Sequence, residues 1–270
     1  MDDGRDSWVF FLNRLQLFIL QHYGGLATVG IFNLSIQLSS IISIIAVSFG
    51  NAWQPLVYSA VNRESAANII ARTAKYFTAG MLLFSLVLFL LSEEILMIIG
   101  RQAYASAKPV LQLAVMGTFL YVLSNLPATV LLYQYRARLS QLIVSVCAAL
   151  NLPLSIVLIQ AWGVHGAAWA MLFSFALLLT GRHLVAQRVM PVNYPWCDLL
   201  KIICIGIVIL VVETVLISPL IPMPYSTIFR IMLLVGYLVG VYITGIFSLQ
   251  EFESVRLTAS NYLKKLGFYK

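Results

Sequence analysis

The segment GLATVGIFNLSIQLSSIISIIAVSFGNAWQPLVYSAVN, residues 25–62, is longer than an ordinary membrane-spanning helix needs to be. A helix of about 34 residues rises on the order of 50 Å, whereas the hydrocarbon core of a bilayer is about 30 Å thick. The segment therefore predicts a long transmembrane helix that tilts, bends or protrudes. Pro55 removes one backbone donor and is the expected kink.

Polar side chains form a stripe along one side of this predicted helix. At 100° per residue they fall within roughly ±60° of one direction. They are Asn33, Gln37, Ser40, Ser48, Asn51, Gln54 and Tyr58. We interpret the stripe as one wall of a substrate cavity, where amides and hydroxyls offer donors and acceptors. The alternative is that these groups join neighbouring helices by hydrogen bonds.

The composition excludes a soluble globular domain. The 270 residues are 61% hydrophobic and 10% charged, with a mean hydropathy of +0.92. Apolar runs of about twenty residues predict an all-α polytopic bundle with about seven full spans after a short first helix. The expected spans are 8–22, 26–61, 68–91, 107–134, 139–160, 166–182, 199–217 and 227–247.

The first span is short and polar, and looks like half of a helix whose other half is missing. We divide the chain into an N-terminal cytoplasmic segment (1–7), a transmembrane bundle (8–190), two additional helices (191–247) and a cytoplasmic amphipathic tail (248–270). The lysines of that tail suit contact with anionic membrane lipids.

Basic residues alternate between the two sides of the predicted bundle. Twelve fall on the side of the C-terminus, Arg182 among them as a loop residue, and only Arg101 and Lys108 fall on the other. Because positive loops stay in the cytoplasm, the C-terminus of this multi-pass protein is predicted to be cytoplasmic. The formal charge of +7 needs no nucleic acid to explain it.

Three further positions are candidate sites. Arg14 lies inside an apolar segment and suits an anionic group, or else pairs with a neighbouring helix. Asn125 lies near Pro127, an expected break in the fourth span. Glu213 is a candidate for ion coupling, with an ion pair to Arg230 as the alternative.

The sequence contains no catalytic motif, no metal-ligand spacing and no cofactor-binding loop, so we expect a protein that is not an enzyme and holds neither metal nor cofactor. Its three cysteines are expected to pack as small hydrophobic residues.

Several short motifs occur in a fixed order. They are Asn13-Arg14 followed by Tyr23-Gly24-Gly25 and Val29-Gly30-Ile31-Phe32, then Ala52-Trp53-Gln54-Pro55, then Gly100 to Tyr104 with Ala107, and then Gly163 to Ala170. Together they resemble the polysaccharide transporter or O-antigen flippase family of the multidrug/oligosaccharidyl-lipid/polysaccharide exporter superfamily. The resemblance extends to about Arg188 and covers only the C-terminal half of that family's architecture.

The resemblance implies two pseudo-symmetric lobes of helices that rock around a central cavity. It implies a location in the bacterial inner membrane and transport of a lipid-linked (undecaprenyl-diphosphate) oligosaccharide across that membrane by alternating access. The chain resembles the second lobe, so a first-lobe segment is an expected partner. The sequence departs from the family pattern at Asn13, Ser155 and Gln160.

Three other functions stay open. A membrane glycan polymerase or ligase is disfavoured by the short outer loops. A drug–cation antiporter of the same superfamily would be expected to carry acidic residues on the cavity face, and residues 25–62 contain none. An inactive truncated remnant is the last alternative.

Overall fold

The computed structural model describes residues 3–100, 106–218 and 225–245, with side chains from Gln16 onward. It confirms the all-α fold. The chain forms two compact units, Met1–Pro195 and Trp196–Lys270, and each is described by itself. The predicted amphipathic tail, residues 248–270, lies outside the described residues.

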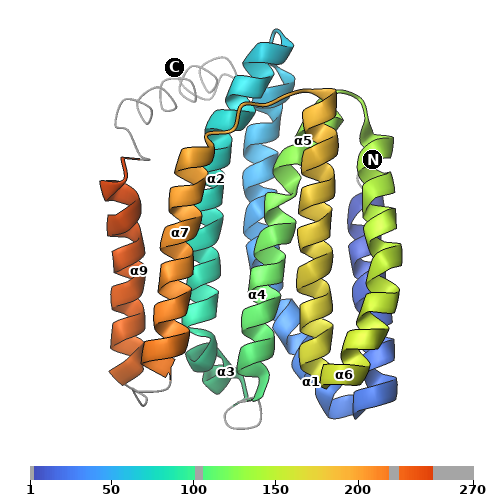
Figure 1. Ribbon diagram of the computed structural model, residues 1–270, viewed down its shortest axis with the longest axis vertical. Coiled ribbons are helices and arrows are strands. Elements are labelled where there is room, and N and C mark those ends of the chain that lie inside the picture. Colours follow the sequence, from blue (N-terminus) through green and yellow to red (C-terminus); the bar gives the residue numbers. More distant parts are fainter. Residues whose placement is uncertain (1–2, 101–105, 219–224, 246–270) are drawn as a thin grey trace, which may run out of the picture. The chain divides into compact units, whose positions relative to one another are not determined.

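The first unit is built from helices α1 to α6 (Figure 1). They are α1 (Asp3–Tyr58), α2 (Arg63–Leu90), α3 (Ser92–Gly100), α4 (Lys108–Leu123), α5 (Asn125–Tyr133) and α6 (Ala137–Val189). The second unit contains α7 (Trp196–Val212), the π-helical segment η2 (Glu213–Ile217) and α9 (Tyr225–Ile243). The first helix begins at Asp3, earlier than the expected start of the first span.

Helices α1 and α6 each fold back on themselves, as Figure 1 shows. Their backbones leave the helical conformation at Gly25 (φ 76°) and Gly163 (φ 57°), in the positive-φ region that glycine adopts without a steric penalty. In α6, Asn151 Nδ2 lies 3.3 Å from the carbonyl oxygen of Ala170. In a straight helix residues 19 positions apart would be about 28 Å apart. Both helices are therefore hairpins.

Six helical stretches in the described residues are long and apolar enough to cross a membrane. Each of the two hairpins, α1 and α6, contributes two helical arms, one before and one after its glycine turn. Helix α4 continues into α5, and α7 continues into η2, so each of these pairs counts as one stretch. The arms and the remaining stretches together correspond to the predicted spans. The chain is a multi-pass membrane protein.

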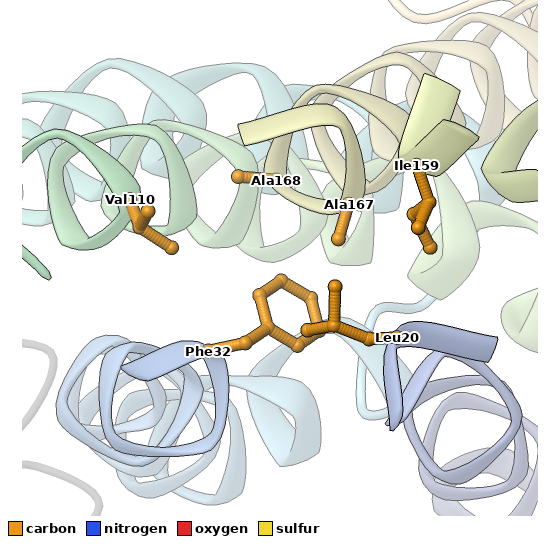
Figure 2. Packing of buried hydrophobic residues seen from close by; sticks show 6 residues of the cluster. All are labelled: Leu20, Phe32, Val110, Ile159, Ala167 and Ala168. Atoms are coloured by element: carbon orange, nitrogen blue, oxygen red, sulfur yellow. The ribbon is translucent and has the colours of Figure 1, made fainter. Parts of the chain in front are cut away.

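The two hairpins pack against α4 in an apolar core of buried residues (Figure 2). Its members are Leu20 and Phe32 of α1, Val110 of α4, and Ile159, Ala167 and Ala168 of α6. The α6 turn is tight, because a Cβ added at Gly166 would lie 1.9 Å from the carbonyl oxygen of Leu158. Close approach of small residues is how helices pack where lipid supplies no hydrophobic drive.

Polar contacts stabilise the starts of helices in this bundle. Asn62 caps α2 by accepting a hydrogen bond from the Ser65 backbone N–H at 2.8 Å. Lys108, at the start of α4, pairs with Glu93 of α3 at 2.8 Å. These contacts position α2 and α4, which flank the cavity described next.

Candidate substrate cavity

A cavity of about 200 Å³ opens within the first unit. It is lined by residues of α1, α2, α4, α5 and α6. They are Ser43, Ala46, Val47, Gly50, Asn51, Trp53, Gln54, Phe77, Tyr121, Asn125, Leu126, Ala128, Thr129, Val144 and Arg182.

One face of α1 forms the largest part of the lining. Most of its members recur at three- and four-residue steps from Ser43 to Gln54, the spacing of one side of an α-helix. Asn51 is exposed and Gln54 is half-buried, so both side-chain amides can offer hydrogen-bond donors and acceptors at the cavity. Trp53 and Phe77 contribute buried aromatic rings beside them.

Residues on both sides of a break in the fourth span form another part of the lining. The helix is interrupted at Ser124, between α4 and α5, three residues before Pro127. The Ser124 hydroxyl donates to the carbonyl oxygen of Tyr121 at 2.6 Å, and the Thr129 hydroxyl donates to that of Asn125 at 3.0 Å. The break brings Asn125 into the cavity lining, while Pro127 itself is buried.

The side chain of Arg182, on α6, contacts this break. Its side chain is buried, with 4% of the residue exposed, and Nη1 donates to Ser124 Oγ at 2.9 Å. Asn51, Val144 and Arg182 each lie about two turns, or ~10 Å, from the helix ends next to residues 59–62, 134–136 and 190–195. The cavity therefore lies nearer to the side of the bundle where those connections run.

Part of the predicted polar stripe lines the cavity. Asn51 and Gln54 of the stripe lie in the lining together with Asn125 of α5. Asn33, Gln37 and Tyr58 are exposed on α1 outside the lining, and Ser40 is half-buried and donates to the Gln37 carbonyl oxygen at 2.6 Å.

The remaining predicted positions of the first unit lie elsewhere. Helix α1 runs through Pro55 to Tyr58 with helical dihedrals, and its interruption is at Gly25. The Arg14 side chain lies outside the described part of the structure.

Glu213 belongs to the second unit. Its Oε1 accepts a hydrogen bond from Arg230 Nε at 3.0 Å, and both side chains are 1% exposed. The carboxylate is therefore held in an ion pair within the α7–α9 unit, the arrangement that the sequence offered as the alternative to coupling.

Two buried polar residues were not predicted from the sequence. Arg182 is not a loop residue, because α6 continues to Val189 and buries it inside the bundle. The signal was an arginine followed by seven further residues of helix-compatible sequence. Gln16 was also missed; its Nε2 donates to Asn151 Oδ1 at 3.1 Å and to Ser155 Oγ at 2.9 Å, joining α1 to α6.

No group of His, Cys, Asp and Glu in the described residues is arranged to hold a metal ion. The chemistry that the lining offers is hydrogen bonding, aromatic contact and one positive charge.

Comparison with known proteins assigns the family. Residues 8–157, more than half of the chain, match MatE. No curated protein and no solved structure matches the chain.

This match overturns the resemblance to polysaccharide transporters and, with it, transport of a lipid-linked oligosaccharide. About half of the residues in the shared motifs are glycines, alanines and prolines. Gly166 allows the tight α6 turn, and Ala167 and Ala168 pack in the apolar core. These residues serve helix packing and do not indicate the substrate. The chain is a membrane transporter, not an enzyme. It belongs to the MatE family, the multidrug and toxin extrusion family of the multidrug/oligosaccharidyl-lipid/polysaccharide exporter superfamily.

Proposed function

We propose that the protein exports an organic substrate in exchange for a cation, by alternating access, and that the substrate binds in the cavity of the first unit. The single observation that carries this proposal is the convergence of Asn51, Gln54 and Asn125 from two helices into an open cavity inside an apolar bundle. Polar groups at membrane depth are costly, and a water-filled or substrate-filled cavity is where they are tolerated.

The wall of the cavity contains the element best suited to movement. At the α4–α5 break Pro127 has no N–H to donate, so one backbone hydrogen bond of the helix is missing, and Arg182 bridges from α6 to Ser124 beside it. A helix interrupted in this way can change its angle without breaking a regular ladder. We propose that substrate entry and release change the angle between α4 and α5.

We further propose that a second helical lobe completes the open side of the cavity. Asn33 and Gln37 are exposed polar residues on the arm of α1 that also carries Asn51 and Gln54. If these side chains faced lipid, they would lose their hydrogen bonds to water. If they faced another lobe across a water-filled cleft, they would keep those hydrogen bonds. Cysteine cross-linking from Asn33→Cys in native membranes tests this expectation.

The charge pattern supports a cytoplasmic C-terminus, and we propose the bacterial inner membrane as the location. Arg182 is buried and no longer counts as a loop residue, but Arg136 and Arg188 stay on the side of the C-terminus. The excess of basic loop residues on that side is therefore preserved. In this orientation the cavity lies nearer to the cytoplasm, the side from which an exporter takes its substrate.

Glu213 remains the candidate for cation coupling. A proton or metal cation that displaces Arg230 from the carboxylate would leave a buried guanidinium unpaired, which is costly. Coupling through Glu213 therefore requires that Arg230 move when the cation binds.

A deletion strain of the native host tests the proposed function. Loss of the gene should raise the accumulation of at least one compound in a panel of fluorescent aromatic anions and cations. The wild-type gene should restore export, and a protonophore or sodium ionophore should abolish it. Gln54→Leu and Asn125→Leu should fail to restore export, whereas Thr180→Ala, an exposed position on α6, should restore it. Unchanged accumulation of every compound would refute the proposal.

A further inference from the structure

The charge of the cavity is set by one residue. Among the described lining residues Arg182 is the charged one, and none is acidic. The sequence itself explains this, because residues 7–63 and 95–197 contain no Asp and no Glu. Helices α4, α5 and α6, and α1 from Ser7 onward, therefore supply no carboxylate to the lining.

The remaining acidic residues of the first unit lie at helix ends. Glu64 is exposed in the first turn of α2, and Glu93, paired with Lys108, stands beside Glu94 in the first turn of α3. None of these three glutamates belongs to the lining. Asp3 and Asp6 lie in the first turns of α1, before the first residue whose side chain is described. A guanidinium in apolar surroundings produces a stronger potential than it would in water, because charges there are less well screened.

The position of Arg182 suits recognition of an anion. The bond from Nη1 to Ser124 Oγ fixes the side chain at the α4–α5 break. A guanidinium is a planar fork of five N–H donors whose geometry matches carboxylate and phosphate oxygens. Asn51, Gln54 and Asn125 add neutral amides to the same cavity.

The other walls suit an aromatic body. Trp53 and Phe77 are buried beside the opening, and the Tyr121 ring lies 5.1 Å from that of Phe175, centroid to centroid. Aromatic faces would also attract a cation, but that attraction acts against repulsion from Arg182.

We infer that the cavity binds an organic anion, an aromatic or apolar body carrying one carboxylate, sulfonate or phosphate group placed against Arg182. This inference deepens the proposed function by naming its substrate class. The group can belong to a free compound or to the headgroup of an anionic lipid.

A matched pair of probes tests the inference on the full chain in nanodiscs of phosphatidylcholine. 1-Naphthalenesulfonate and 1-naphthyltrimethylammonium share one ring system and carry opposite charges. Calorimetry or equilibrium dialysis should find the sulfonate bound at least tenfold more tightly. Arg182→Gln keeps a donor for Ser124 and removes the charge, so it should weaken sulfonate binding about tenfold and abolish the preference. Arg188→Gln, an exposed arginine on the same helix, should leave both affinities unchanged.

Adding phosphatidylglycerol to the nanodiscs identifies the source of the anion. Displacement of the sulfonate assigns the site to a lipid headgroup, and retained binding assigns it to a free anion; both support an anion site. Tighter binding of the ammonium probe to the wild-type chain would overturn the inference, even if Arg182→Gln failed to fold. Equal sulfonate affinity in a folded Arg182→Gln variant would overturn it too. Either result leaves the proposed export function intact, because that function is measured by accumulation in cells.

Discussion

Arg182 Nη1 donates a hydrogen bond to Ser124 Oγ at 2.9 Å, joining α6 to the point where the fourth span breaks into α4 and α5. Ser124→Ala removes the acceptor and leaves a buried guanidinium donor to find another. A hydrogen bond to a charged group contributes about 1.5–3 kcal/mol. Thermal unfolding in detergent should show a loss of this size.

Ser140→Ala is the matched control for that loss. Ser140 is also buried in the first unit, but its hydroxyl has no hydrogen-bond partner among the described residues. An equal loss of stability in both variants would mean that the Arg182 contact contributes nothing specific.

The polar network around Asn151 is expected to hold the two hairpins together. Asn151 contacts Gln16 of α1, and Ser155, Ser174 and the Ala170 carbonyl of α6. Asn151→Leu should lower the free energy of unfolding by about 1–3 kcal/mol, since it leaves several buried groups without partners.

A double-mutant cycle separates the Gln16 contact from the rest of the network. Gln16→Leu combined with Asn151→Leu should cost less than the sum of the single changes, with a coupling of about 1 kcal/mol. Strict additivity would show that the two side chains do not interact.

Gly166→Ala is expected to prevent the α6 hairpin from closing. The added Cβ would lie 1.9 Å from the Leu158 carbonyl oxygen, a distance that only backbone movement relieves. We expect a loss of ~3 kcal/mol or more, or failure to fold, measured by unfolding in detergent.

Gly30→Ala provides the comparison. A Cβ at Gly30 of α1 meets nothing within 4 Å, and alanine favours helix over glycine by up to about 1 kcal/mol. This variant should be as stable as the wild type or more so. Similar behaviour of the two glycine variants would contradict the tight turn.

The Glu213–Arg230 pair is expected to be stabilising only as a pair. Glu213→Gln or Arg230→Gln alone leaves one buried charge and should cost about 3–5 kcal/mol. Replacing both by hydrophobic residues should recover most of that loss. If the double variant also exports with normal cation dependence, Glu213 is not the coupling residue.

Much of the fold followed from hydropathy, because apolar runs and their glycine breaks determine where helices cross and reverse. The stretch around Gly163 predicted a turn between two spans, and the structure places the α6 reversal there. The correspondence is weaker in the site, where Asn51, Gln54 and Asn125 line the cavity but Asn33 and Gln37 do not. A stripe on one helix shows which residues share a direction, whereas the cavity depends on where α5 and α6 cross that stripe.

Arg182 could not be assigned from helical periodicity alone. An arginine near the end of a span reads equally well as a loop cation or as a buried one, and its Ser124 partner lies 58 residues away. The family resemblance was wrong because about half of its motif residues are glycines, alanines and prolines, which serve backbone packing, and only Trp53 and Gln54 among its described motif residues line the cavity.

Protection of one cysteine tests most directly whether the cavity holds the substrate. Val47→Cys, at an exposed lining position of α1, in a chain whose Cys147, Cys197 and Cys204 are replaced by serine, is alkylated with and without a compound that the protein exports. We expect the compound to slow alkylation at position 47 several-fold and to leave Arg188→Cys unaffected. Equal alkylation rates at position 47, with export still intact, would contradict a substrate site in this cavity.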